Sequence, residues 1–256
     1  MLPGLIRAAP EPLAPRKTRV KPQLRLPLQR PPSYRREDLV VSQANAAAVA
    51  VLDAWPAWPA GAVALVGPAG CGKTHLANIW AERAGAARLE AGALPGQLDA
   101  LRGHPIVVEA AEEADEEVLF HLINMAEDCG GLLLTSRIRP SAWRASLPDL
   151  KSRLNAVTVA EIEPPDDVIL LGVLRKFFRE RNIRPADDVF AYLVRRMERS
   201  VPVAWDLVER LDEASGGEHR PVSRALAREV LEEGPETGNL FADRLAEADS
   251  SGDKGR

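Results

Sequence analysis

The stretch "GPAGCGKT", residues 67–74, combines glycines, a lysine and a hydroxyl group at a spacing that suits phosphate binding. Its constrained letters fit the pattern G-x-x-x-x-G-K-[ST], and they lie between an apolar run and a helical pattern. Glycines let successive backbone N–H groups turn toward phosphate oxygens, while the start of a helix adds partial positive charge. Lys73 would reach the β- and γ-phosphates, and Thr74 would ligate Mg²⁺. The predicted nucleotide-binding residues of the loop are Gly67, Pro68, Ala69, Gly70, Cys71, Gly72, Lys73, Thr74 and His75.

Two alternatives accompany this phosphate loop. A glycine-rich strand-to-helix turn can also bind nothing, although a full motif in its expected strand–loop–helix context favours the phosphate site. Cys71 is either a redox-sensitive thiol or a residue small enough to fit the loop, and we favour the second interpretation.

The elements around the loop predict an α/β fold. Short runs of continuous apolar residues are typical of strands in a parallel sheet that is covered on both faces. Helical patterns, with apolar residues at i, i+3 and i+4, separate these runs. We expect five parallel strands at 62–66, 87–91, 104–110, 132–136 and 156–162, and helices at 46–55, 74–85 and 115–131.

The chain changes character at both ends of this region. Residues 1–36 are rich in proline and arginine, which predicts an extended, disordered basic leader. After "EPPDD" every element has a helical pattern, so a small all-helical domain is expected, with helices at 167–182, 186–198, 202–215 and 222–233. Trp55 and Trp58 are expected to pack against that helical domain. The predicted domains are the leader (1–36), an α/β nucleotide-binding domain (37–162), the helical domain (163–234) and a flexible tail (235–256).

Composition limits the class of protein. The net charge of −4 hides an asymmetry, because the leader carries nine basic residues against one acid and the other 220 residues have a net charge of −12. Cys71 and Cys129 are too few for a disulfide framework and indicate a reducing compartment. No apolar run approaches the roughly 20 residues of a membrane span. The leader also has the arginine-rich, acid-poor composition of an organelle transit peptide, but its eight prolines oppose the amphipathic helix of such a peptide.

Several segments together resemble the AAA+ ATPases of the bacterial replication initiator DnaA and its relatives. "GKTHL" and the preceding "LVVSQAN" resemble the family's phosphate loop and entry segment, and the resemblance covers roughly residues 37–232. It implies a P-loop core with a helical lid, bound to ATP or ADP with Mg²⁺. "LLLTS" resembles the sensor strand, "LPDLKSRL" the segment with an arginine finger, and "EPPDD" the start of the lid. The resemblance implies that Val40 and Val41 lie near the adenine, that Thr135 and Ser136 are sensors, and that Arg153 is the finger.

The chain departs from this family at its acidic site. An active ATPase of this type ends the third strand with two acids, whereas "PIVVEAAEE" provides Glu109 followed by Ala110. With Thr74, Glu109 would hold Mg²⁺, but intrinsic hydrolysis is expected to be weak because a water-positioning carboxylate contributes about 10²-fold or more. Glu112 or Glu113 could replace it, although both have the character of solvated acids at a helix start. In the lid, Arg199 is the nearest candidate for a sensor arginine.

The leader contains "QLRLPL", whose leucines are spaced two apart. Gln23, Leu24, Leu26, Pro27 and Leu28 resemble the short motif with which replication proteins bind the DNA sliding clamp, the β subunit of DNA polymerase III. An extended peptide of this kind places apolar side chains in pockets of a rigid partner, and a proline lowers the entropy cost. The alternative is a hydrophobic patch that packs on the chain's own core.

These features favour a negative regulator of DNA replication initiation over a complete initiator. The resemblance implies that an initiator continues beyond its lid into a helix-turn-helix domain that reads duplex DNA, whereas this sequence stops after one more helix and a polar tail. It would dock on the clamp and thereby associate with DNA indirectly. There Arg153 would act in trans on DnaA-bound ATP, and an arginine finger of this kind raises the hydrolysis rate by about 10³–10⁵. Arg153 could instead form an ordinary surface ion pair. The remaining alternatives are a non-catalytic docking module for another replication protein and an autonomous ATPase acting on single-stranded DNA. The expected location is the bacterial cytoplasm, at the nucleoid or replisome, without a membrane partner; homo-oligomers are compatible with this interpretation.

Overall fold

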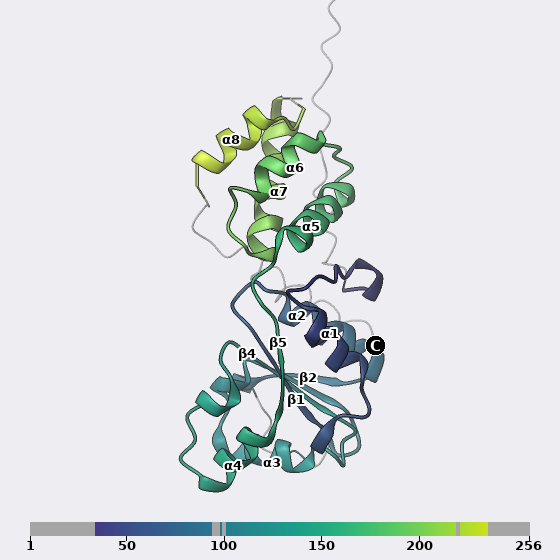
Figure 1. Cartoon of the computed structure of the whole chain (residues 1–256), viewed down its shortest axis with the longest axis vertical. Coiled ribbons are helices and arrows are strands. Elements are labelled where there is room, and N and C mark those ends of the chain that lie inside the picture. The colour runs from purple at the N-terminus through teal and green to yellow at the C-terminus, as the bar shows by residue number, and fades with distance from the viewer. Residues whose placement is uncertain (1–33, 94–97, 99–100, 219–220, 235–256) are drawn as a thin grey trace, which may run out of the picture. The chain divides into compact units, whose positions relative to one another are not determined.

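The computed structural model describes residues 34–93, 98, 101–218 and 221–234. Within these residues the fold is α/β, with a parallel sheet followed in the chain by four helices (Figure 1). The leader motif at Gln23–Leu28 and the tail 235–256 lie outside the described residues.

The sheet of the described chain has five strands, all parallel, in the order β2-β3-β4-β1-β5. The strands are β1 (Ala62–Val66), β2 (Ala87–Glu90), β3 (Ile106–Glu109), β4 (Leu132–Ser136) and β5 (Thr158–Glu161). Register pairs Val66 with Ser136 on one side and with Glu161 on the other, so the carboxyl ends of three strands meet where the phosphate loop begins. The predicted five-stranded parallel sheet is confirmed, and β1 is the strand that leads into the loop.

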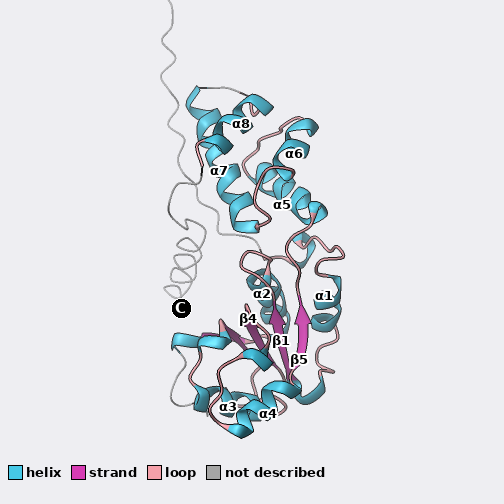
Figure 2. Ribbon diagram, turned by 60° about the vertical axis from the view of Figure 1, so that its left-hand side comes forward, coloured by secondary structure: helices cyan, strands magenta, loops and turns pink. Residues whose placement is uncertain are grey.

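Helices cover both faces of the sheet, as Figures 1 and 2 show. Because successive strand residues point to opposite faces, Val63 and Leu65 pack with α1 (Ala46–Asp53) and α2 (Lys73–Ala84). Ala62, Ala64 and Val66 pack with α3 (Glu116–Met125) and α4 (Pro148–Ala156). The continuous apolar run of β1 therefore reflects a strand buried on both sides, as the sequence indicates.

Local signals explain the helix boundaries. α2 ends at Gly85, whose φ of 63° is left-handed and suits glycine. α3 begins after Asp115, whose side chain accepts hydrogen bonds from the backbone N–H groups of Glu117 and Val118. α4 was not predicted as a helix, because only Leu150 and Leu154 of its nine residues are buried and they leave a weak apolar pattern.

The remaining helices of the described chain have a hydrophobic core of their own, to which Phe178, Phe190 and Leu211 contribute. Phe178 and Phe190 meet edge to face at 5.5 Å between ring centroids. These lid helices are α5 (Asp167–Glu180), α6 (Asp187–Val194), α7 (Val201–Glu218) and α8 (Arg224–Glu232). The domain boundaries drawn from the sequence remain a prediction.

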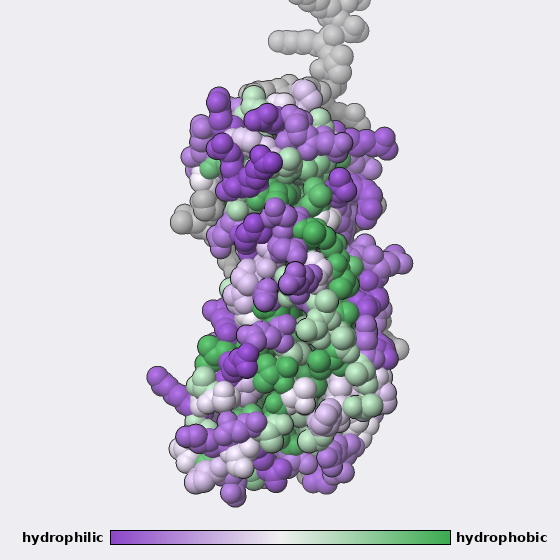
Figure 3. Space-filling view, viewed as in Figure 1, coloured by the Kyte–Doolittle hydropathy of each residue, from purple (hydrophilic) through white to green (hydrophobic). Residues whose placement is uncertain are grey.

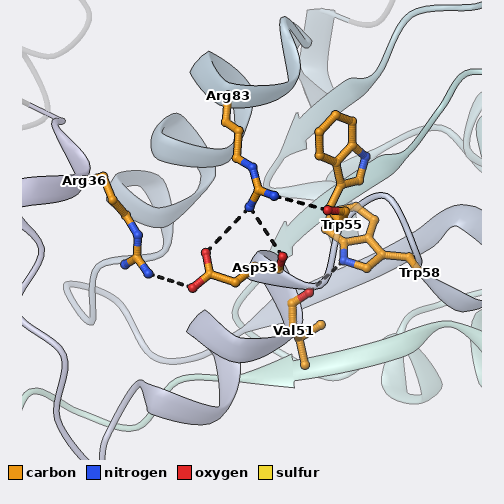
Figure 4. Close-up of polar contacts among 6 residues, drawn as sticks. All are labelled: Arg36, Val51, Asp53, Trp55, Trp58 and Arg83. Carbon is orange, nitrogen blue, oxygen red and sulfur yellow. Dashed lines mark hydrogen bonds and ion pairs between the residues drawn. The ribbon is translucent and has the colours of Figure 1, made fainter.

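The prediction for Trp55 and Trp58 is wrong, because both pack on the sheet domain. Trp58 stacks on the buried Trp80 of α2 at 4.9 Å between centroids, and its indole N–H donates to the Val51 carbonyl. The Trp55 indole N–H donates to the Gly130 carbonyl. Figure 4 shows how Asp53 joins Arg36 and Arg83 beside these rings. Both indoles contact Trp80 of α2. These rings are far apart in the sequence, so no local pattern predicts the contacts.

The surface is mainly hydrophilic in the view of Figure 3, with hydrophobic side chains grouped in its middle part. Val41 and Val168 are among the large apolar residues that remain exposed, at 47% and 58%. None of the helices in the described ranges is long and apolar enough to cross a membrane.

Candidate nucleotide-binding site

The phosphate loop connects the buried end of β1 to the start of α2. The Gly67 N–H donates to the Ser136 carbonyl of β4 at 3.2 Å, which anchors the loop to the sheet. Gly70 and Gly72 have φ values of 72° and 101°, a region that residues with a Cβ rarely adopt. A Cβ at Gly72 would meet no atom within 4 Å, so the loop is open on that side. This geometry fits a loop that wraps its backbone around phosphate.

Lys73 extends over the same loop. Its Nζ donates to the carbonyls of Gly67 at 2.7 Å and Pro68 at 2.8 Å. The ammonium is thus held beside the residues that would surround the β- and γ-phosphates, where a nucleotide could add oxygen ligands to it. The lysine and the loop together fit ATP or ADP.

Cys71 fills space within the loop. Its side chain is 4% exposed, and a Cβ added at Gly67 would lie 2.8 Å from its sulfur. Burial raises the pKa of the thiol, against a smaller opposing effect of Lys73. The interpretation of Cys71 as a small residue that fits is therefore better supported than that of a reactive thiolate.

Glu109 at the end of β3 and Thr135 on the adjacent strand β4 form the acidic part of the site. The Thr135 hydroxyl donates to Glu109 Oε2 at 2.6 Å and accepts from the Ala110 N–H at 3.2 Å. Burial raises the pKa of Glu109, and the Thr135 hydrogen bond only partly offsets this effect. Glu109 Oε1 is buried without a hydrogen-bond partner among the described residues. An uncompensated carboxylate oxygen at the end of β3 fits a role toward a hydrated cation.

No group of three or more His, Cys, Asp or Glu side chains in the described part of the chain could hold a metal alone. Mg²⁺ bound here would depend on nucleotide phosphates and water, with Thr74 and Glu109 as the protein groups, which is the usual manner of Mg²⁺ in such sites.

Glu112 and Ser136 have structural partners. Ala110 has a φ of 52° and places a methyl group directly after Glu109. Glu112 accepts a hydrogen bond from the Arg137 N–H at 2.9 Å. The Ser136 hydroxyl donates to the Ile138 carbonyl at 2.7 Å and lies 3.2 Å from the indole nitrogen of Trp143. Of the two predicted sensors, Thr135 thus contacts the acidic site, whereas Ser136 fixes the following turn.

The entry segment, residues 38–41, lies between α2 and α5. Val40 packs so closely on Gly172 of α5 that a Cβ there would approach its Cγ2 to 2.5 Å. The Asn45 side chain donates to the Val40 carbonyl at 2.9 Å, and Asp38 forms a 3.2 Å ion pair with Lys176. Val41 is 47% exposed. The segment therefore contributes Val40 and Val41 beside the lid, where an adenine contact remains a prediction.

His75, the residue after Thr74, joins this group. Its ring meets Tyr34 edge to face at 5.6 Å between centroids, and its Nε2 is buried without a partner in the described structure. Burial and the nearby Lys176 ammonium lower the pKa of His75 to about 4, against the opposing effect of Asp38. The imidazole is therefore neutral at physiological pH.

The lid helices touch the phosphate loop directly. The Val201 N–H at the start of α7 donates to the Gly70 carbonyl at 3.0 Å. A Cβ at Gly70 would lie 2.3 Å from the Ser200 hydroxyl, so glycine is required both for φ and for this approach. Arg199, the candidate sensor arginine, instead donates to the Pro165 carbonyl and pairs with Asp167 at 2.6 Å. Its guanidinium is thus engaged where the lid begins.

Arg153 lies on α4, on the face of the sheet opposite to α2. Leu150 and Leu154 bury α4 in the core formed with α3, whereas Leu76 buries α2 in the other core. The Arg153 side chain is exposed, and its Cζ lies 5.5 Å from the centroid of the Phe120 ring. Arg153 is therefore not brought to the chain's own phosphate loop by its helix.

Sequence reasoning missed two contacts of this site. The bond between Thr135 and Glu109 and the ion pair between Asp38 and Lys176 join distant parts of the chain. Neighbouring strand ends gave a signal for the first, because β3 and β4 pair in the sheet. The second had none, since it depends on how the entry segment meets the lid.

Comparison with known proteins agrees with this geometry. No protein-family model matches the chain. It is 28% identical over 234 residues to the chromosomal replication initiator protein DnaA of Thermomicrobium roseum, a match that covers 79% of this chain and 50% of DnaA. The chain thus spans about half the length of that relative.

Two solved structures share the fold. Domain III of the Thermotoga maritima replication initiation protein DnaA has a TM-score of 0.67 at 17% identity, with 80% of this chain and 98% of that chain covered. A replication initiator DnaA bound to AMPPCP and single-stranded DNA has a TM-score of 0.58 at 18% identity, with 73% and 66% covered. The chain therefore shares its fold with these two DnaA structures. In sequence it is similar to DnaA over most of its own length.

Proposed function

We propose that this chain is a negative regulator of DNA replication initiation that resembles Hda, the DnaA-related AAA+ protein that stimulates hydrolysis of DnaA-bound ATP. The observation that carries the proposal is the methyl group of Ala110 beside a fitting phosphate loop. An active ATPase of this type has its water-orienting carboxylate at that position. A chain with this arrangement would bind a nucleotide and hydrolyse it slowly. Its regulatory effect would then come from another residue, acting on the ATP of a partner.

Arg153 supplies that effect in this proposal. It is exposed on the helix across the sheet from the chain's own phosphate loop, a position that suits action on a neighbouring molecule. Its planar guanidinium would neutralise charge that develops on the γ-phosphate of DnaA-bound ATP.

The bound cofactor of the chain itself would be ADP or ATP with Mg²⁺, held by the phosphate loop with Lys73, Thr74 and Glu109, beside Val40 and Val41. The DnaA structure with AMPPCP supports nucleotide binding by this fold. Binding should raise the unfolding free energy by about 2.7 kcal/mol at a nucleotide concentration 100 times Kd. Thermal unfolding with and without ADP measures this gain, which Lys73→Ala should abolish.

The partners in this proposal are DnaA and the sliding clamp, which the leader residues Gln23–Leu28 would bind. Docking would place the chain on clamp-loaded DNA, in the bacterial cytoplasm at the replisome, and raise its effective concentration for DnaA there.

Phosphate release from DnaA loaded with radiolabelled ATP tests the proposal. DnaA is incubated with clamp, DNA and the full chain as wild type, Arg153→Ala, Arg153→Lys or Leu26→Ala/Leu28→Ala. We expect Arg153→Ala to lower the stimulated rate by about 10³-fold or more. Arg153→Lys keeps the charge but should recover little, because lysine lacks the planar fork. The leucine variant should lose only the clamp-dependent part.

Arg144→Ala is the matched control, since it removes another exposed arginine from the segment before α4. It should leave the stimulation unchanged. If wild type gives no stimulation but still binds the clamp, the chain is a docking module. Rapid hydrolysis by the chain alone would instead favour an autonomous ATPase.

A further inference from the structure

The lid segment that leads into α7, residues 198–202, contacts the phosphate loop through its backbone and small side chains. The Val201 N–H donates to the Gly70 carbonyl at 3.0 Å. A Cβ at Gly70 would lie 2.3 Å from Ser200 Oγ and 3.3 Å from Pro202 Cδ. Ser200 is only 7% exposed. One peptide of the phosphate loop therefore lies directly against the lid.

The lid segment is itself fixed at both ends. Arg199 donates to the Pro165 carbonyl at 3.1 Å and pairs with Asp167 at 2.6 Å, where the chain enters the lid. The Ser200 carbonyl accepts the Ala204 N–H at 3.1 Å, which begins the hydrogen-bond pattern of α7. Because these bonds hold the segment independently of the phosphate loop, it can act as a support for the loop.

Gly70 and Gly72 differ in their relation to this support. Both have a left-handed φ, 72° and 101°, which glycine adopts readily and other residues rarely do. A Cβ at Gly72 would meet no atom within 4 Å, whereas one at Gly70 would press on the lid segment. Ordering a loop of glycines around phosphate costs conformational entropy, which lowers affinity. A fixed contact at Gly70 reduces that cost.

We propose that Ser200 and Val201 are positioning residues of the nucleotide site, which act through Gly70. The Val201 N–H orients the Gly70 peptide group, and Ser200 fills the space into which this residue would otherwise relax. The loop is thereby held in the form that presents its backbone N–H groups to phosphate. The lid strengthens nucleotide binding by ordering the loop, with a backbone group and a neutral side chain in place of a charged one. This inference rests on the nucleotide binding proposed above.

Binding of fluorescent N-methylanthraniloyl-ADP to the full chain, followed by anisotropy, tests the hydrogen bond. Val201→Pro removes the N–H at the first position of α7, where helices accept proline. Its control is Val201→Ala, which also removes the valine side chain but keeps the N–H. Because a net hydrogen bond changes an equilibrium by about fivefold, Val201→Pro should bind ADP about fivefold more weakly than Val201→Ala.

A second set of variants tests the contact between Ser200 and Gly70. Gly70→Ala should weaken ADP binding on the order of 10²-fold, because its methyl group presses on the lid and its left-handed φ is unfavourable. Ser200→Gly removes the obstructing side chain, and glycine is tolerated at the residue before a helix. Added to Gly70→Ala, it should recover about tenfold of the affinity. Added to Gly72→Ala it should recover none, because a Cβ at Gly72 meets no lid atom within 4 Å.

Unfolding free energies of all variants are measured without nucleotide beside the affinities. Lower stability with ADP affinity at the wild-type level would show a merely structural contact and overturn the inference. Equal ADP binding by the two Val201 variants, or equal rescue of both alanine variants by Ser200→Gly, would overturn it as well. If Val201→Pro unfolds, the rescue of Gly70→Ala still decides. A wild-type chain that binds no ADP would overturn the proposed nucleotide site too, whereas the other contrary outcomes leave that site in place.

Discussion

At the scale of single residues, Ala110 separates nucleotide binding from hydrolysis. Ala110→Glu places a carboxylate where the water-orienting acid would stand, beside Glu109 at the end of β3. We expect intrinsic ATP hydrolysis to rise by about 10²-fold, the usual contribution of a general base. Steady-state phosphate release by the chain alone measures this rise. A double variant with Lys73→Ala should show none, and an unchanged rate in the single variant would mean that Ala110 is not what limits hydrolysis.

His75 predicts how stability depends on pH. Its pKa is about 4 in the folded chain, against about 6.5 when unfolded. Between these values the unfolded chain binds a proton that the folded chain excludes, so stability falls as the pH drops from 6.5 toward 4. Allowing for partial exposure of the ring, the loss is about 2 kcal/mol.

Urea unfolding of wild type and His75→Gln at several pH values isolates this effect. The two curves should run in parallel above pH 7 and diverge below 6.5, with wild type losing more. Lys176, Asp38 and Tyr34 also face the imidazole but are present in both proteins. Identical pH profiles would show that folding does not lower the pKa of His75.

At the scale of elements, the entry segment packs closely on α5 because residue 172 is a glycine without a Cβ. Gly172→Ala adds a Cβ about 2.5 Å from Val40 Cγ2, and such overpacking costs about 1–3 kcal/mol. Alanine also favours the helix by about 1 kcal/mol over glycine. We therefore expect the single change to lower the unfolding free energy slightly.

In a Val40→Ala background the same Gly172→Ala change should become stabilising, because the clash is gone and the helix preference remains. Chemical denaturation of the four proteins measures this change of sign. Gly172→Ala effects of equal size in both backgrounds would mean that Val40 and Gly172 do not contact each other.

Elements were predictable where burial leaves a local pattern. β1 and β4 are buried at every residue, so their apolar runs gave the same bounds as the structure. α4 buries too few residues to show a period. The tryptophans were assigned to the wrong partner because Trp58 and Trp80 are far apart in the sequence and meet only through the packing of α2.

The candidate site also has a part that the sequence predicted and a part that it did not. The phosphate loop was predictable since one short segment carries all of its constraints. Hydrogen-bond partners that come from separate segments of the chain could not be predicted. Ser136 is engaged by Ile138 and Trp143, and Arg199 by Pro165 and Asp167, contacts that depend on the fold around them.

At the scale of the whole molecule, Asp38 and Lys176 join the entry segment to the lid. Their side chains are only 18% and 11% exposed, so the 3.2 Å pair is partly shielded from water. We expect a coupling energy of about 1–2 kcal/mol from a double-mutant cycle with Asp38→Asn and Lys176→Met. Unfolding free energies of the four proteins give this value. Additive effects would show that the pair does not fasten the lid.

The same entry segment continues directly from the leader. A pull on the leader would therefore act on the contacts of Tyr34 with His75, of Arg36 with Asp53 and of Asp38 with Lys176. Tension along the leader would thus strain contacts with α1, with the phosphate-loop helix and with the lid at the same time.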